Sequence, residues 1–264
     1  MRVDHRPAVA EVSGPSPGRE VPLARYTAVV LGGVTALVLA ANPATRWFAR
    51  LRREDDPDYP DDVPLLFDVN TEATVPTWYS AGLLLAVAAA CGVLAVVATA
   101  ANGPAGRRWA VLGLVFVGMS LDEAVALHER LGSGVTDTLG VEGTGALQHP
   151  WVVAGVVLAA ALAVVTARAI VSLPRHRRLW VALGLGIYVG GALGLEAVSG
   201  VVLDTAGDGL EYAAVTWAEE GAEMVGALIA CCALLSALDV RVHDGGLRVA
   251  LADTAGAVAP RGHA

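Results

Sequence analysis

The chain has 264 residues, of which 55% are hydrophobic and only 17% are charged, and its mean hydropathy is +0.57. Soluble domains are about 45–50% apolar and about 25% charged, so this composition argues against a water-soluble globular fold. The net charge of −8 argues against nucleic acid as a partner, because nucleic acids recruit basic surfaces.

The first 25 residues combine Pro, Gly and Arg without an apolar period, which predicts a disordered tail at 1–25. Apolar segments follow, which we interpret as transmembrane helices. They lie at about residues 26–41, 77–101, 109–129, 150–171, 179–201 and 211–238. The first segment is short, and a cleaved signal peptide is the alternative for it.

We therefore predict an all-α integral membrane protein, a six-transmembrane-helix bundle over residues 26–240, with a second disordered tail at 241–264. With a cytoplasmic N-terminus, 13 of the 18 basic residues fall on the cytoplasmic side. The positive-inside rule then places both termini in the cytoplasm. All the basic residues are arginines in a chain rich in Ala, Gly and Val, which indicates a GC-rich bacterial genome and hence the bacterial cytoplasmic (inner) membrane.

The first outer loop, residues 42–76, begins with arginines beside Trp47, Phe48 and Leu51. We interpret residues 43–53 as an amphipathic piece lying along the lipid headgroups. The acidic run at 54–62 is a solvated linker or, alternatively, a patch that collects cations. Alternating oxygens follow at Asp68, Asn70 and Glu72, but they lack the glycine and terminal glutamate of a calcium loop.

Acidic residues fall within the apolar segments. The third segment is free of charge only over residues 109–121, about 20 Å of helix, which is too short for about 30 Å of hydrocarbon. The sixth is free of charge only over residues 224–238, so both helices carry acids into the membrane. The group predicted in the outer half of the bilayer is Asp122, Glu123, His128, Glu196, Glu219, Glu220 and Glu223.

An ionised carboxylate in a low-dielectric site costs several kcal/mol unless it is paired. This excess of acid therefore requires protonation, a bound cation or a water-filled cavity. On a helix, Glu219, Glu220 and Glu223 share one face within about two turns. Asp122 and His128 project about 120° apart on a continuous helix, so their spacing predicts no direct pairing.

Neither a Glu-x-x-His motif nor a His-Glu-x-x-His motif is present, so a metal site has to be assembled from several helices. We predict that these seven residues bind a divalent ion (Fe, Mn, Mg, Ca or Zn) for an enzymatic reaction on a lipidic or membrane-soluble substrate. Glu219, Glu223 and Asp122 are the predicted catalytic residues.

Two other functions use the same acids. A proton- or cation-coupled transporter of small solutes would take up ions through them, and an assembly or scaffold subunit would pair them with arginines of a partner. Single residues also have structural alternatives: Glu196 as a packing carboxyl, His149 as a helix cap, and Glu129 with Arg130 as a solvated helix end. The three cysteines are interpreted as packing residues. No oligomeric state is specified.

Overall fold

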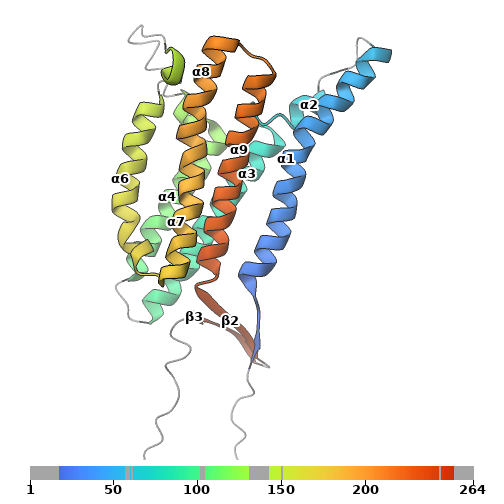
Figure 1. Ribbon diagram of the computed structural model, residues 1–264. Helices are drawn as coiled ribbons and strands as arrows, with labels where there is room; N and C mark the ends of the chain where they lie inside the picture. Colours follow the sequence, from blue (N-terminus) through green and yellow to red (C-terminus); the bar gives the residue numbers. More distant parts are fainter. Residues whose placement is uncertain are drawn as a thin grey trace, which may run out of the picture.

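The computed structural model describes residues 18–56, 60, 62–101, 105–130, 143–149, 151–243 and 245–252. Long helices lie side by side in a bundle, and a small sheet closes one end (Figure 1). The opposite end, near α2, η1 and the turn between α8 and α9, is called the distal end below. The predicted helical membrane architecture is thus confirmed in outline.

The helices follow the predicted segments closely. Their bounds are α1 Leu23–Asp55, α2 Asp62–Leu66, α3 Val75–Ala100, α4 Ala105–Val125, α6 Trp151–Val171, α7 Arg175–Val189, α8 Glu196–Ala206 and α9 Leu210–Leu235. A 3₁₀ turn, η1 (Gly145–Leu147), precedes α6, and a π-helical turn, η2 (Gly190–Leu195), joins α7 to α8. The α7–η2–α8 run therefore forms one long rod beside α9 (Figure 1).

Four helical runs in the described part of the chain are long and apolar enough to cross a membrane: α1, α3, α6 and the run Arg175–Ala206. Their outward side chains are apolar. Leu37 on α1 is 71% exposed and Val164 on α6 is 77% exposed. Apolar surface of this extent is unfavourable in water and suits lipid, so the chain is a membrane protein. The two remaining predicted spans, α4 and α9, carry more charge.

Helix α1 is longer than predicted. Residues 43–53, expected as a separate headgroup-lying piece of the loop 42–76, continue α1 without interruption past Pro43. A proline cannot donate the backbone hydrogen bond to the carbonyl four residues earlier. Here the indole Nε1 of Trp217 on α9 donates to the Leu39 carbonyl instead, at 2.9 Å. A tertiary contact thus satisfies the acceptor that Pro43 leaves open.

The sheet corrects the predicted tails. Strands β1 (Arg19–Glu20), β2 (Leu238–His243) and β3 (Gly246–Leu251) pair antiparallel in the order β1-β2-β3. Residues 241–243 and 246–251, expected to be disordered, are strand residues here. Leu238 and Val240 alternate inward on β2 and are buried, which holds this sheet against the helices. Residues 19–20 and 23–25, expected in the disordered N-terminal tail, belong to β1 and α1. Residues 1–17 and 253–264 lie outside the described part. Pairing of β1 with β2 brings the first and last described segments to the same end of the bundle.

The core lies between α3, α4, α7 and α9. Leu84, Val87 and Cys91 on α3 are fully buried, as is Met224 on α9, and α7 crosses α9 at glycines. A Cβ added at Gly184 would lie 2.6 Å from the backbone nitrogen of Ala230. Small residues allow helices to approach this closely.

Other glycines differ in how closely they approach a neighbouring helix. A Cβ at Gly113 would lie 3.3 Å from the Ala88 carbonyl oxygen, and one at Gly191 would lie 2.9 Å from the Glu219 carbonyl oxygen. A Cβ at Gly118 or Gly190 would have no such neighbour within 4 Å.

Candidate functional site

A cavity of about 360 Å³ lies toward the distal end of the bundle, and we call it the acidic cavity. Its wall comes from the loop before α3, from α4 and the turn after it, from the segment before α6, and from α6, the α7–η2–α8 run and α9. Its acidic and histidine residues are Glu72, Asp122, Glu123, His128, Glu129, His149, Glu196, Glu219, Glu220 and Glu223. All seven predicted site residues are thus brought to one cavity.

The charges of this wall are one-sided. Eight of its residues carry carboxyl groups, and within the described residues the wall contains no arginine, while lysine is absent from the chain. Ionised carboxylates at this density repel one another unless protons or a cation reduce the charge. The acidic cavity is therefore chemically suited to bind a positive species.

Helix α9 contributes the most deeply buried acids. Glu219 and Glu223 are only 5% and 8% exposed, one turn apart on the helix face predicted from their spacing. Oε2 of Glu219 is buried and has no hydrogen-bond partner among the described residues. The Glu219 side chain also lies against the carboxyl of Glu196. A buried acceptor without a donor costs free energy, so this atom is the clearest open ligand position.

Asp122 and His128 pair directly, contrary to the expectation from a continuous helix. Helix α4 ends at Val125, and Ala126 takes a positive φ of 48°. The chain therefore turns back, and the His128 backbone N–H donates to Asp122 Oδ1 while the ring Nδ1 lies 2.9 Å from Oδ2. The 120° separation was wrong because the helix does not continue to residue 128.

The environment of His128 favours its charged form. Burial opposes the charge, but the hydrogen bond that the ring donates to Asp122, with the nearby charges of Asp122, Glu129 and Glu196, outweighs it and raises the pKa of His128 above its usual value.

A second histidine–carboxylate pair lies next to the first, and Trp151 contacts both. Nδ1 of His149 lies 3.4 Å from Glu196 Oε1, and the Trp151 indole donates to the same oxygen at 3.2 Å. The His128 ring packs against Trp151 with centroids 4.3 Å apart. Each histidine thus turns Nδ1 toward a carboxylate, and Nε2, once it has lost its proton, is the nitrogen available to an ion. Metal-binding histidines use this arrangement.

The π-helical turn η2 positions Glu196. π turns insert an extra residue into a helix and are frequent at functional sites. At η2, Gly191 packs so tightly on α9 that an added Cβ would lie 3.0 Å from Glu223 Cγ. Glu196 begins α8 directly after this turn. The close approach brings the acid of the α7–η2–α8 run to those of α9.

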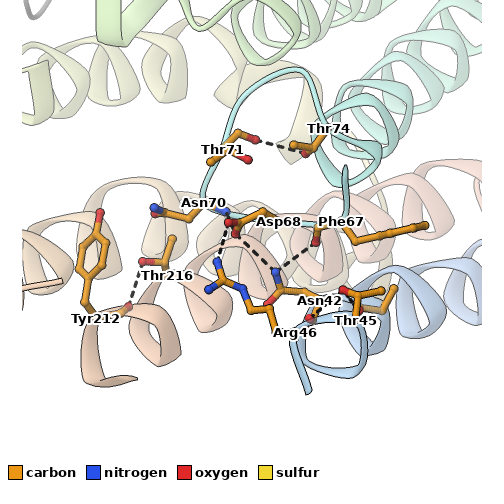
Figure 2. A network of polar contacts seen from close by, with 11 residues as sticks. Asn42, Thr45, Arg46, Phe67, Asp68, Asn70, Thr71, Thr74, Tyr212 and Thr216 are labelled. Carbon is orange, nitrogen blue, oxygen red and sulfur yellow. Dashed lines mark hydrogen bonds and ion pairs between the residues drawn. The ribbon is translucent and has the colours of Figure 1, made fainter. Parts of the chain in front are cut away.

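Figure 2 shows how the loop before α3 is held. Asp68 forms an ion pair with Arg46 of α1, and its Oδ1 accepts from the backbone N–H of Asn70 and from Asn42. Asn42 also donates to the Phe67 carbonyl at 3.1 Å. Asp68 is therefore a structural anchor, which argues against the calcium-loop alternative. The anchored loop presents Glu72 to the cavity.

The pKa of Glu72 is raised, first by burial and then by the charge of Glu129.

Some lining residues were assigned other roles from the sequence. Glu129 and His149 were interpreted as a solvated helix end and a helix cap, yet both line the cavity. The hydroxyl of Ser120 donates to the Ala81 carbonyl at 2.8 Å, so it joins α4 to α3. The tyrosines Tyr188 and Tyr212 also line the cavity, and no spacing in the sequence indicated them.

The acids do not yet converge as ligands. In the part of the chain that the structure describes, no three His, Cys, Asp or Glu side chains are placed to hold one ion. Binding would require carboxylates to rotate inward from the cavity wall.

Residues 31–238 match a protein family described as "Domain of unknown function (DUF8692)". The match covers well over half of the chain, so the chain belongs to this family. No curated protein and no solved structure shows significant similarity to it.

Proposed function

We propose that this member of the DUF8692 family is a membrane-embedded enzyme of the bacterial cytoplasmic membrane that binds a divalent metal ion in the acidic cavity. The metal would supply Lewis acidity, polarising a substrate oxygen or lowering the pKa of bound water. The family description assigns no activity, so the proposal stands on the chemistry of the cavity.

The observation that carries the proposal is the position of Glu219. Its Oε2 is buried without a hydrogen-bond partner among the described residues, in a cavity whose wall holds seven further carboxyl groups. Leaving a buried polar group unpaired costs about 1–3 kcal/mol, and more for a charged one. A bound cation removes this cost and the mutual repulsion together, which favours an ion site over a packing role.

The donor set suits an oxygen-preferring ion with some imidazole ligation. Glu219, Glu220 and Glu223 supply oxygens from α9, and His128 and His149 each offer Nε2. Carboxylates with imidazole select Mn, Fe, Mg or Zn rather than thiolate-preferring copper. Asp122 and Glu196 orient the two histidines through Nδ1, and Glu123 completes the acid wall from α4.

This chain's own groups also supply proton transfer. A carboxylate beside a bound ion can accept a proton from water or from a substrate hydroxyl. Glu219 and Glu223 are buried on the cavity wall, away from bulk water, so we assign them this role together with Asp122. The Tyr188 hydroxyl contacts Glu223 and holds it toward the cavity.

The proposed crossing of the membrane also uses the charged residues of the chain. We propose that α4 and α9 also cross the bilayer, which makes six spans with both termini cytoplasmic and the acidic cavity in the outer half. The pairing of Arg19–Glu20 with Arg241–Val242, before the first helix and after the last, supports an even number of crossings. Reporter fusions ending at Ala101 and at Gly207 should report the cytoplasm and the outside, respectively. The same side for both would contradict six spans.

Catalysis is favoured over transport by the closed core between α3 and α9. Leu84, Leu94 and Met224 are 0% exposed there. A transporter of ions or solutes needs a route to both sides in turn.

Metal analysis of the purified protein tests the proposal. We expect stoichiometric divalent metal after growth with Mn²⁺, Fe²⁺ and Zn²⁺, with its loss in Glu219→Gln and Glu223→Gln. Glu211→Gln, an exposed acid of the same helix outside the cavity wall, should retain it. Protein that binds none of Mn²⁺, Fe²⁺, Mg²⁺, Ca²⁺ or Zn²⁺ would overturn the proposal.

A further inference from the structure

The acidic cavity continues toward the sheet end as an apolar limb. Its wall there includes Leu112 and Phe116 on α4, Leu158 and Leu162 on α6, and Leu185 on α7. None of these side chains can ligate an ion or donate a hydrogen bond. The metal proposal therefore gives this apolar part of the cavity no role.

The limb has the same length when it is measured along two of the helices that line it. Leu112 lies 11 residues before Glu123 on α4, and Leu185 lies 11 residues before Glu196 on the α7–η2–α8 run. At a rise of about 1.5 Å per residue each interval is about 16 Å. That is about half of the roughly 30 Å hydrocarbon thickness of a bilayer, the depth of one leaflet.

The limb is open toward the side of the bundle. Leu158 on α6 and Val189 on α7 line the cavity yet are 59% and 38% exposed. Nearer the acids the same seam is tight, since a Cβ at Gly155 would lie 2.7 Å from Leu193 Cδ2. An opening that faces lipid and leads to an apolar channel admits a molecule from the bilayer.

The charge of the acidic end restricts the polar head of that molecule. With eight carboxyl groups and no arginine among the described wall residues, an anionic head is repelled. A cationic or uncharged head is accepted, and the wall also contains the aromatic residues Trp151 and Tyr212, a residue type that attracts cations.

From these observations we infer that the substrate is a single-chain amphiphile with an uncharged or cationic head, whose alkyl chain lies in the limb between α4, α6 and α7 and whose head reaches the acids. This inference rests on the proposed function only for the reaction at the head group of the amphiphile. The position of the chain is tested independently of the metal.

The test uses the full-length protein in phosphatidylcholine nanodiscs and a dodecylamine with a photoreactive diazirine at the chain end. After irradiation, mass spectrometry should find the label on Leu112, Phe116, Leu162 and Leu185. Unlabelled dodecylamine and dodecanol should compete at least about tenfold better than dodecyl sulfate. Label confined to lipid-facing residues such as Val164, or equal competition by dodecyl sulfate, would overturn the inference.

A variant that fills the limb and a matched variant on the exposed side of α6 test where the alkyl chain lies. Ala159→Trp places a large ring in the limb and should reduce labelling about tenfold or more, whereas Val164→Trp, on the exposed side of the same helix, should not. Leu162→Phe serves the same purpose if Ala159→Trp does not fold. Undiminished labelling in a folded limb variant overturns the inference.

Mn²⁺ binding, measured in the same samples, separates the two proposals. Limb variants that lose the label but bind Mn²⁺ like the wild type support both. Limb-specific labelling without any metal binding overturns the proposed function while the position of the chain stands.

Discussion

The two halves of α9 differ in chemistry along a single buried stripe. Toward the distal end the stripe consists of Thr216, Glu219 and Glu223, and toward the sheet end it continues with Ala230 and Leu234. The backbone geometry is the same in both halves, and both are buried. Burial in the sheet-side half is satisfied by close apolar packing, whereas burial in the distal half leaves acids around a cavity. The difference shows where along α9 close apolar packing ends and the acidic cavity begins.

In the sheet-side half of α9, Met224→Ala should cause the largest loss of stability. Met224 is 0% exposed, and deleting a buried side chain of this size costs about 2–5 kcal/mol through lost contacts and the cavity left behind. Thermal unfolding in detergent measures the loss. Val225→Ala, on the exposed side of α9, should cost much less, and equal losses would contradict a packed core there.

In the distal half of α9, Glu219→Gln should change the stability of the protein in a direction that depends on whether metal is present. In chelator the variant should be more stable than the wild type, because one member of a repelling buried cluster has been made neutral. With Mn²⁺ at about 100 times its dissociation constant, the wild type should gain about 2.7 kcal/mol, and the variant much less. Unfolding curves with and without Mn²⁺ measure both, with Glu211→Gln as the control. A variant less stable than wild type in chelator would contradict the repulsion.

The glycine crossing of α7 and α9 is the next target. Gly184→Ala puts a methyl group 2.6 Å from the Ala230 nitrogen, and we expect about 1–3 kcal/mol of destabilisation from overpacking. Gly186→Ala, two residues away with no such neighbour within 4 Å, should be neutral or stabilising because alanine favours helix. Comparable melting temperatures for both variants would show that the crossing is looser than described.

The smallest expected effect concerns Glu72 at the cavity rim. Its pKa is raised in the folded protein by burial and by Glu129, so the folded state holds the proton more tightly than the unfolded state. Its burial therefore costs stability as pH rises from the unfolded pKa of 4.5 through the folded value. Glu72→Gln should stabilise the folded protein by less than about 1 kcal/mol at pH 7.5, because Glu72 is only partly buried and solvent screens its charge. The gain should vanish near pH 4, and a gain that persists there would exclude this cause.

The sequence predicted which helix faces carry the acids of the distal half. The spacing of Glu219, Glu220 and Glu223 predicted one acidic face, because helical periodicity depends only on local geometry. The short apolar run at residues 109–121 predicted that α4 carries Asp122 and Glu123 into the membrane. The pairing of Asp122 with His128 was missed, because the end of α4 at Val125 depends on a backbone turn that no composition signal marks.

The sequence by itself determined the segments that form long apolar helices and the helix faces that carry acid, since both follow from hydropathy and a period of 3.6 residues. Only the tertiary structure decided that acids from α4, α8 and α9 share one cavity with His128 and His149, that Trp217 supports α1 at Pro43, and that Leu238–His243 pairs with Gly246–Leu251. Each of these depends on contacts between residues distant along the chain, and such contacts are fixed by packing rather than by local preference.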